Sequence, residues 1–174
     1  PAIVSGQNTN SQIFYGSFLS TYIERDVKLL SDAIDSLKFL RFITATAARC
    51  SQMLNVAEIA QDADINQKQA KNWLQILETL GIIFYLHPYS NNQLKRLVKT
   101  PKLYFYDTGL VCHLTRWSSP EVLENGAMNG AVLENYVVSE IAKTWLNSGK
   151  EPYMYYYRDK DAKEIDIVLE HDGI

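Results

Sequence analysis

Apolar residues follow a helical period in the first part of the chain and an extended one after Gly81. Before that glycine they recur every three or four positions, which is typical of amphipathic helices. Ser17 and Asn66 are suitable N-caps, and Gly81 supplies a left-handed helix stop. We therefore predict a non-periodic linker over residues 1–16 and helices over residues 17–30, 35–50, 56–60 and 66–80.

The rest of the chain predicts strands on either side of a helical segment. Residues 82–87 and 102–106 are rich in β-branched and aromatic residues and enclose a turn-like stretch. Three helices followed by such a hairpin have the order of a winged helix, a variant of the helix-turn-helix. The remaining predicted elements are a short helix within 107–125, a long helix over 127–146, and strands over 153–158 and 163–169.

The predicted fold class is therefore α+β, in three segments. Residues 1–34 form a linker and an N-terminal helix, residues 35–106 a winged-helix unit, and residues 107–174 an α/β module. The apolar content of 47% is ample for a folded core. No apolar run approaches the roughly 20 residues that a membrane-spanning helix needs, so no membrane partner is expected.

Charge and cysteine content narrow the functional classes. The two cysteines, Cys50 and Cys112, lack metal-type spacing, so we expect reduced, buried thiols in a cytoplasmic protein. A net charge of −3 and a pI near 5.6 argue against a general polyanion binder. A nucleic-acid interface would therefore require a local basic patch.

Such a patch is predicted on the helix over residues 66–80. Its apolar stripe holds Trp73, Leu74 and Leu77, and the opposite face is rich in amides and lysines, which suit base edges and phosphates. The hairpin adds further cations, with Lys102 at its second strand. The candidate nucleic-acid-binding residues are Lys68, Lys71, Asn72, Gln75, Lys95, Arg96 and Lys99. The alternative is a solvated face on a unit that docks onto proteins.

Carboxylates form a second candidate site. The last strand alternates, which predicts Ile165, Ile167 and Leu169 in a core and the side chains of Glu164 and Asp166 together on the other face.

In the long helix, Glu134 falls inside an apolar arc that includes Leu133, Val137 and Ile141. A carboxylate in such an arc is costly unless it is paired, protonated or bound to a metal. A helix packed over the last strand would bring Glu134 and Asp166 together as ligands for Mg²⁺ or Mn²⁺, with Glu164 as a third candidate. The alternative is a buried ion pair of Glu134 with Arg158 or Lys163.

Five runs of residues resemble one known family, the domain of unknown function 4143. They are YIERDV (22–27), NWLQILETLGIIFYLHPY (72–89), KRLVKTPKLYFYDTGL (95–110), GAVLENYVVSEI (130–141) and YYYRDKDAKEIDIVLE (155–170). In bacterial and archaeal proteins this domain usually follows an AAA-type P-loop ATPase domain. The resemblance runs from about residue 14 to the end.

The resemblance implies a restriction-endonuclease-like fold of the PD-(D/E)xK type for the second module. Glu134 would be its helix glutamate and Asp166 its motif aspartate, so both are candidate catalytic and metal-binding residues. The Glu-x-Lys strand that completes such a site is expected beyond Ile174, and an ATPase domain before Pro1. We therefore expect a module truncated at its C-terminal end in a chain truncated at both ends.

Three functional hypotheses follow. The first is a nucleic-acid-binding and regulatory region of an ATPase, without catalysis in these residues, whose partners are DNA or RNA and the missing ATPase domain. The second is a metal-dependent nuclease completed beyond Ile174, and the third is an inert nuclease-like scaffold for partner docking or oligomerisation. No Gly-x₄-Gly-Lys-Ser/Thr string occurs, so ATP is expected only in the missing domain. No cofactor is expected here, and Mg²⁺ or Mn²⁺ would belong to the full-length protein.

Overall fold

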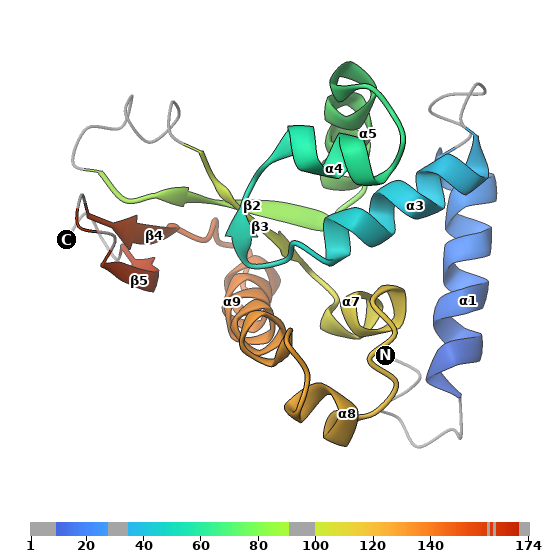
Figure 1. Ribbon diagram of the computed structural model, residues 1–174. Helices are drawn as coiled ribbons and strands as arrows, with labels where there is room; N and C mark the ends of the chain where they lie inside the picture. Colours follow the sequence, from blue (N-terminus) through green and yellow to red (C-terminus); the bar gives the residue numbers. More distant parts are fainter. Residues whose placement is uncertain (1–9, 28–34, 91–99, 160, 162, 171–174) are drawn as a thin grey trace.

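The computed structural model describes residues 10–27, 35–90, 100–159, 161 and 163–170 (Figure 1). The chain is a mixed α/β protein with one curled five-stranded sheet. Its helices are α1 (Ser11–Thr21), the π-helix η1 (Tyr22–Val27), α3 (Ser36–Ala47), α4 (Val56–Asp62), α5 (Gln67–Thr79), α7 (Thr108–Leu114), α8 (Pro120–Glu124) and α9 (Asn129–Asn147). Its strands are β1 (Gln52–Met53), β2 (Ile83–Pro88), β3 (Lys102–Phe105), β4 (Met154–Arg158) and β5 (Glu164–Leu169).

The sheet has the strand order β1-β3-β2-β4-β5. It therefore contains strands from both sides of the predicted boundary between residues 106 and 107. Strands β2 and β3 are antiparallel, as the predicted hairpin requires, and β3 also pairs with β1. The end of β2 pairs in parallel with β4, and β4 pairs antiparallel with β5. In Figure 1 the sheet lies between α4 and α5 on one side and α7, α8 and α9 on the other.

Helix caps explain most of the element boundaries. Asn66 accepts a hydrogen bond from the backbone N–H of Gln69 and begins α5, and Gly81 follows the helix at φ +67°, both as predicted. The predicted first helix is present over residues 17–27, and residues 28–30 lie outside the described ranges, but its predicted start is wrong. Asn10 caps it instead of Ser17, which lies inside α1, because the Asn10 side chain accepts from the N–H of Gln12 and Tyr15 is already buried.

The larger core cluster joins the helices to the sheet. Phe39 and Phe42 of α3 pack edge-on against Trp73 of α5, with ring centroids 5.2 and 5.3 Å from the indole. Leu74 and Leu77 are buried beside Trp73, as their spacing predicts. A second, smaller cluster lies under α9 and holds Leu86, Tyr104, Val138, Ala142, Met154 and Tyr156.

The cysteines are free thiols, as expected from their spacing. Cys50 is fully buried, and burial raises the pKa of its thiol to about 12. Cys112 is half-buried. Within the part of the chain that the structure describes, no helix has the length and apolar character needed to cross a bilayer.

The rotation of α9 about its axis differs from the prediction. Leu133 and Val137, which were expected in the apolar arc, are 61% and 44% exposed. The buried face instead includes Asn135, whose amide donates to the carbonyl of Phe105 (3.0 Å) and accepts from the N–H of Phe105 (2.8 Å). These two bonds hold α9 to the end of β3 and turn Leu133 outward.

The last strand also departs from simple alternation. Tyr155 pairs with Val168 and Tyr157 with Ile165, so Tyr156 alone stands opposite both Asp166 and Ile167. This β-bulge shifts the alternation by one residue, so Asp166 and Ile167 turn toward the same face. Ile167 packs against the smaller core cluster, whereas Ile165 and Leu169 are half-exposed, so the prediction of three core residues in β5 is wrong for two of them.

Candidate functional site

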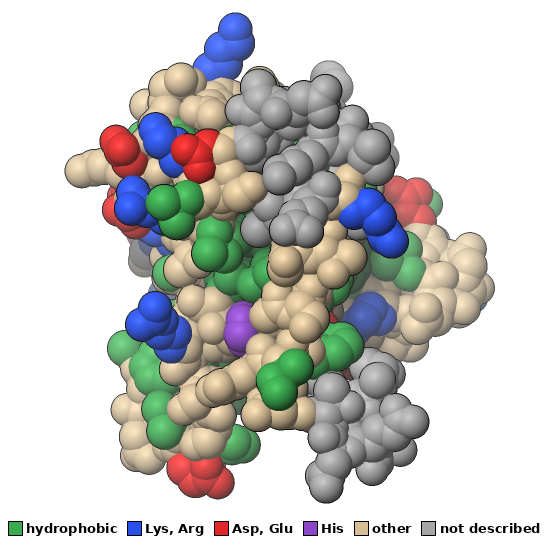
Figure 2. Space-filling view, turned by 90° about the vertical axis from the view of Figure 1, so that its right-hand side faces the viewer, with side chains coloured by type: hydrophobic (Ala, Val, Ile, Leu, Met, Phe, Trp, Pro, Cys, Tyr) green, Lys and Arg blue, Asp and Glu red, His purple; other side chains and the backbone are tan. Residues whose placement is uncertain are grey.

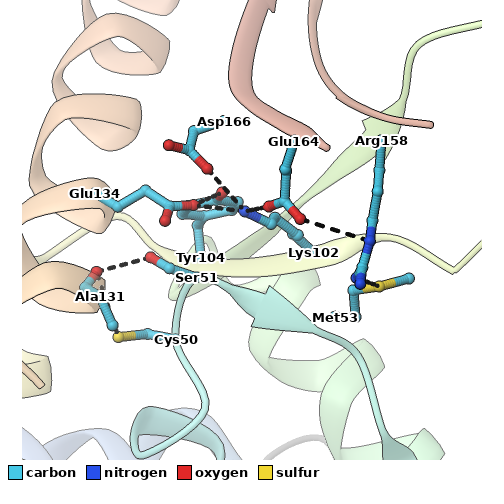
Figure 3. Close-up of polar contacts among 10 residues, drawn as sticks. All are labelled: Cys50, Ser51, Met53, Lys102, Tyr104, Ala131, Glu134, Arg158, Glu164 and Asp166. Atoms are coloured by element: carbon cyan, nitrogen blue, oxygen red, sulfur yellow. Dashed lines mark hydrogen bonds and ion pairs between the residues drawn. The ribbon is translucent and has the colours of Figure 1, made fainter. Parts of the chain in front are cut away.

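Lys102, the first residue of β3, lies at the centre of a cluster of acidic side chains (Figure 3). Its Nζ is 2.9 Å from Oε1 of Glu134 in α9 and 3.3 Å from Oδ1 of Asp166 in β5, and it also contacts Glu164. The lysine is buried, with only 4% of its surface exposed. We call Lys102 and these three carboxylates the polar centre.

Tyr104, on the same strand as Lys102, adds a hydrogen bond to the polar centre. It lies two residues after Lys102, so both side chains project from one face of β3. Its hydroxyl donates to the same Glu134 oxygen at 2.6 Å. Burial and the hydrogen bond to Glu134 both raise the pKa of the Tyr104 phenol, so the hydroxyl remains a donor.

Electrostatics keep the lysine charged. Burial alone would lower the pKa of Lys102, but its hydrogen bonds to Glu164 and Glu134 outweigh burial and raise the pKa above the ordinary value. Three carboxylates surround this single ammonium, so the polar centre carries excess negative charge. A second cation, Arg158, has its Nε 3.9 Å from Glu164 at the outer edge.

Three local features position the acidic side chains. The Asn135 bonds to Phe105 set the rotation of α9 and so direct Glu134 toward β3. The hydroxyl of Ser51 donates to the carbonyl of Ala131 (2.8 Å) and ties the start of α9 to the segment before β1. Alternation in β5 places Asp166 on the face that holds Glu164, and the bulge adds Ile167 to that face.

The predicted convergence of Glu134 and Asp166 is present. Since both carboxylates lie within 3.3 Å of one nitrogen, they are well inside the roughly 8 Å over which two carboxyl groups can share an ion. The cation that they share is the Lys102 ammonium. The alternative of an ion pair for Glu134 is thus correct in kind, but its partner is Lys102 instead of Arg158 or Lys163.

The ammonium also bears on the metal hypothesis. Carboxylate oxygens suit Mg²⁺ or Mn²⁺, but here one oxygen of each carboxylate already pairs with the Lys102 ammonium. Across the described ranges, no group of three or more His, Cys, Asp and Glu side chains forms a metal site. The predicted carboxylate donors are therefore present, but the cation between them is the ammonium of Lys102, which belongs to the chain itself.

The second set of candidates lies on α5, away from the polar centre. Lys68, Lys71, Asn72 and Gln75 are all exposed on the face opposite Trp73. Lys95, Arg96 and Lys99 lie outside the described residues. Lys102 was grouped with the hairpin cations, and that grouping is wrong because its side chain is buried among carboxylates.

Sequence reasoning missed Lys102, Tyr104 and Asn135 as members of this arrangement. A signal for two of them was available in the strand KLYF. Leu103 and Phe105 are core residues on one face, so alternation places Lys102 and Tyr104 together on the other. A lysine inside a strand with only aromatic and aliphatic neighbours needs a carboxylate partner.

Comparison with known proteins divides the chain near residue 125. A family model described as a domain of unknown function (DUF8612) matches residues 1–121, and a second domain of unknown function (DUF4143) matches residues 129–174. The resemblance noted from the sequence is thus shown for the C-terminal segment, whereas the segment before it matches the other model.

Full-length relatives are longer than this chain. An uncharacterized protein of Mycobacterium tuberculosis and one of Mycobacterium bovis are each 28% identical over 173 residues. The match covers 99% of this chain but only 38% of each relative. No solved structure matches. Since the DUF8612 model covers well over half of its residues, the chain belongs to the DUF8612 family of domains of unknown function.

Proposed function

We propose that this chain is a nucleic-acid-binding and regulatory region of a larger ATPase and performs no catalysis itself. The observation that carries the proposal is the exposed face of α5. Lys68 and Lys71 project from it together with Asn72 and Gln75, and the opposite face is anchored in the core through Trp73. Lysines and amides on a rigid, exposed helix are suited to phosphates and base edges.

The surroundings of α5 support this role. Helices α3, α4 and α5 are followed by the antiparallel pair of β2 and β3, which is the element order of a winged helix. In a winged helix the last of the three helices contacts the groove, and here that helix is α5. Since the net charge of the chain is −3, nucleic-acid binding would depend on the local charge of the exposed α5 face and not on the overall charge.

The absence of catalysis is proposed from the polar centre. The charged Lys102 pairs with one oxygen each of Glu134, Glu164 and Asp166 within the chain. It also links β3, α9 and β5, so its removal would loosen three elements at once. This arrangement favours a structural role for the polar centre.

The larger ATPase is proposed from the resemblance of the C-terminal segment to DUF4143. It is supported by relatives that extend well beyond the matched region, since this chain spans only 38% of their length. In such a protein the nucleotide would bind outside these residues, because they contain no P-loop string.

Fluorescence anisotropy with labelled duplex DNA, single-stranded DNA and RNA tests nucleic-acid binding. The Lys68→Ala/Lys71→Ala double variant should bind more weakly to every sequence, and the slope of log K against log salt should flatten by roughly one unit for each phosphate that the variant no longer neutralises. The control is Lys143→Ala/Lys150→Ala, which removes the same charge from α9 and the segment after it. Equal weakening in both double variants, or no binding by the wild type, would leave protein docking as the role of α5.

A metal-dependent nuclease is the second candidate, favoured by the convergence of Glu134 and Asp166. It requires ligands beyond those of the polar centre, such as the Glu-x-Lys strand implied by the resemblance. Assays of the full-length protein with Mn²⁺ or Mg²⁺, beside Asp166→Asn, test it directly. Cleavage that depends on both the metal and Asp166 would establish this candidate and overturn the non-catalytic proposal.

A further inference from the structure

A cavity of about 640 Å³ lies between α1 and α7, apart from both the polar centre and the exposed face of α5. Its walls include Gln12 and Tyr15 from α1, His113 from α7, and Arg116 and Trp117 from the segment after α7. The volume is in the range of sites that bind small molecules. Figure 2 shows the face of the molecule that carries α1, where a histidine side chain lies at the surface.

The charged groups that line this cavity are of one sign. Arg116 is its cation, and none of the described residues that line it is Asp or Glu. Burial lowers the pKa of His113, so this imidazole is neutral near pH 7 and leaves the guanidinium as the charge in the cavity. A wall with one guanidinium and no carboxylate matches an oxyanion.

Trp117 carries a donor that lacks an acceptor. Its Nε1–H is buried, and no hydrogen-bond partner for it occurs within the described ranges. A buried donor without an acceptor costs about 1–3 kcal/mol, so such groups usually have a partner. Because this N–H is buried, it faces packed protein atoms, and Trp117 lines the cavity with other atoms of its side chain.

Close packing fixes the aromatic walls. The Trp117 ring lies so close to Gly126 that a Cβ there would be 2.3 Å from it, and a Cβ on Gly109 would be 2.1 Å from the Tyr15 hydroxyl. That hydroxyl donates to Asp107 at 2.9 Å, and the Tyr15 ring packs against His113 with centroids 5.6 Å apart. The cavity therefore has fixed, flat aromatic side chains beside its cation.

We propose that the cavity between α1 and α7 binds a small molecule that carries a carboxylate or phosphate on a planar, apolar body. The guanidinium of Arg116 holds the oxyanion, and the planar body packs against the aromatic walls. This site is independent of nucleic-acid binding by α5.

Isothermal titration calorimetry with three probes tests the site: benzoate, adenosine monophosphate and inorganic phosphate. Benzoate or adenosine monophosphate should bind with a Kd of about 1 mM or tighter, and the tighter binder is the probe for the variants below. Inorganic phosphate, which lacks a planar body, should bind at least about tenfold more weakly. A Kd weaker than about 1 mM for both planar probes would overturn the proposal.

Arg116→Gly separates binding from folding. Arg116 has a φ of +64°, a conformation that glycine adopts without strain, so this variant should unfold at the same or a higher temperature than the wild type. Its affinity for the better probe should nevertheless fall about 10- to 100-fold, because a charge-assisted hydrogen bond is removed. Unchanged affinity in Arg116→Gly would refute the site.

Trp117→Phe provides a second readout, because this indole lines the cavity whereas Trp73 is buried in the core. Binding should change the tryptophan fluorescence of the wild type but much less that of Trp117→Phe. The charge-matched control is Lys150→Gln, which removes an exposed cation after α9 and should bind like the wild type. A fluorescence response that survives in Trp117→Phe would place the ligand elsewhere and contradict the assignment.

Discussion

The Nζ of Lys102 lies 2.9 Å from Oε1 of Glu134, although the two residues are 32 positions apart in the chain. Lys102 belongs to the segment that matches DUF8612, whereas Glu134 and Asp166 belong to the segment that matches DUF4143. The polar centre therefore links the two family segments through ion pairs. The sheet also contains strands from both segments.

Replacing Lys102 with Met should destabilise the fold by about 3–5 kcal/mol, because three carboxylates would lose their shared cation. The measurement is the free energy of unfolding by urea titration. Lys143→Met, which breaks the exposed pair of Lys143 with Glu140, is the control and should change stability by about 0.5 kcal/mol or less. A destabilisation by Lys102→Met no larger than that by the control would contradict a structural role.

Stability should fall in alkaline solution. The pKa values of Lys102 and Tyr104 are both raised in the folded state, so their contribution is complete below the ordinary values of 10.5 and 10.0. It is lost as the pH rises through the higher folded values, because the unfolded chain releases its protons first. Urea titrations from about pH 10 to about pH 12 should show this decline, with a shallower slope in Lys102→Met and Tyr104→Phe. Parallel slopes in all three proteins would argue against the assignment.

Asn135→Leu should cost about 2–3 kcal/mol, because it leaves the buried N–H and C=O of Phe105 without their partner. Differential scanning calorimetry of this variant beside Asn72→Leu, an exposed position on α5, isolates the effect of burial. If the two variants melted at the same temperature, the Asn135 bonds would not be what fixes the rotation of α9.

Local signals predicted much of this fold. Asn66, the apolar stripe around Trp73, and Gly81 define α5 through contacts within a few residues, and the strands on either side of the 89–101 segment follow from composition. The features that failed are set by distant partners. Asn135, and not the predicted apolar arc, sets the rotation of α9, because its side-chain amide hydrogen-bonds to Phe105, 30 positions away.

The candidate site also has features that local patterns predicted and features that distant partners determine. The helical periodicity around Glu134 and the strand alternation around Asp166 are local patterns, and each gave the face on which its carboxylate lies. The bulge in β5 and the burial of Lys102 depend on how β3, α9 and β5 meet, which no single segment encodes. The cation among the carboxylates was therefore not foreseen.

Calorimetric titration of the protein with Mn²⁺ tests most directly whether Lys102 supplies the cation of the polar centre. The wild type should bind Mn²⁺ no more tightly than about 1 mM at this centre. Lys102→Gln, which leaves Glu134, Glu164 and Asp166 without the ammonium, should bind it at least about tenfold more tightly. Tight binding by the wild type that Asp166→Asn abolishes would instead make the polar centre a metal site and contradict the account.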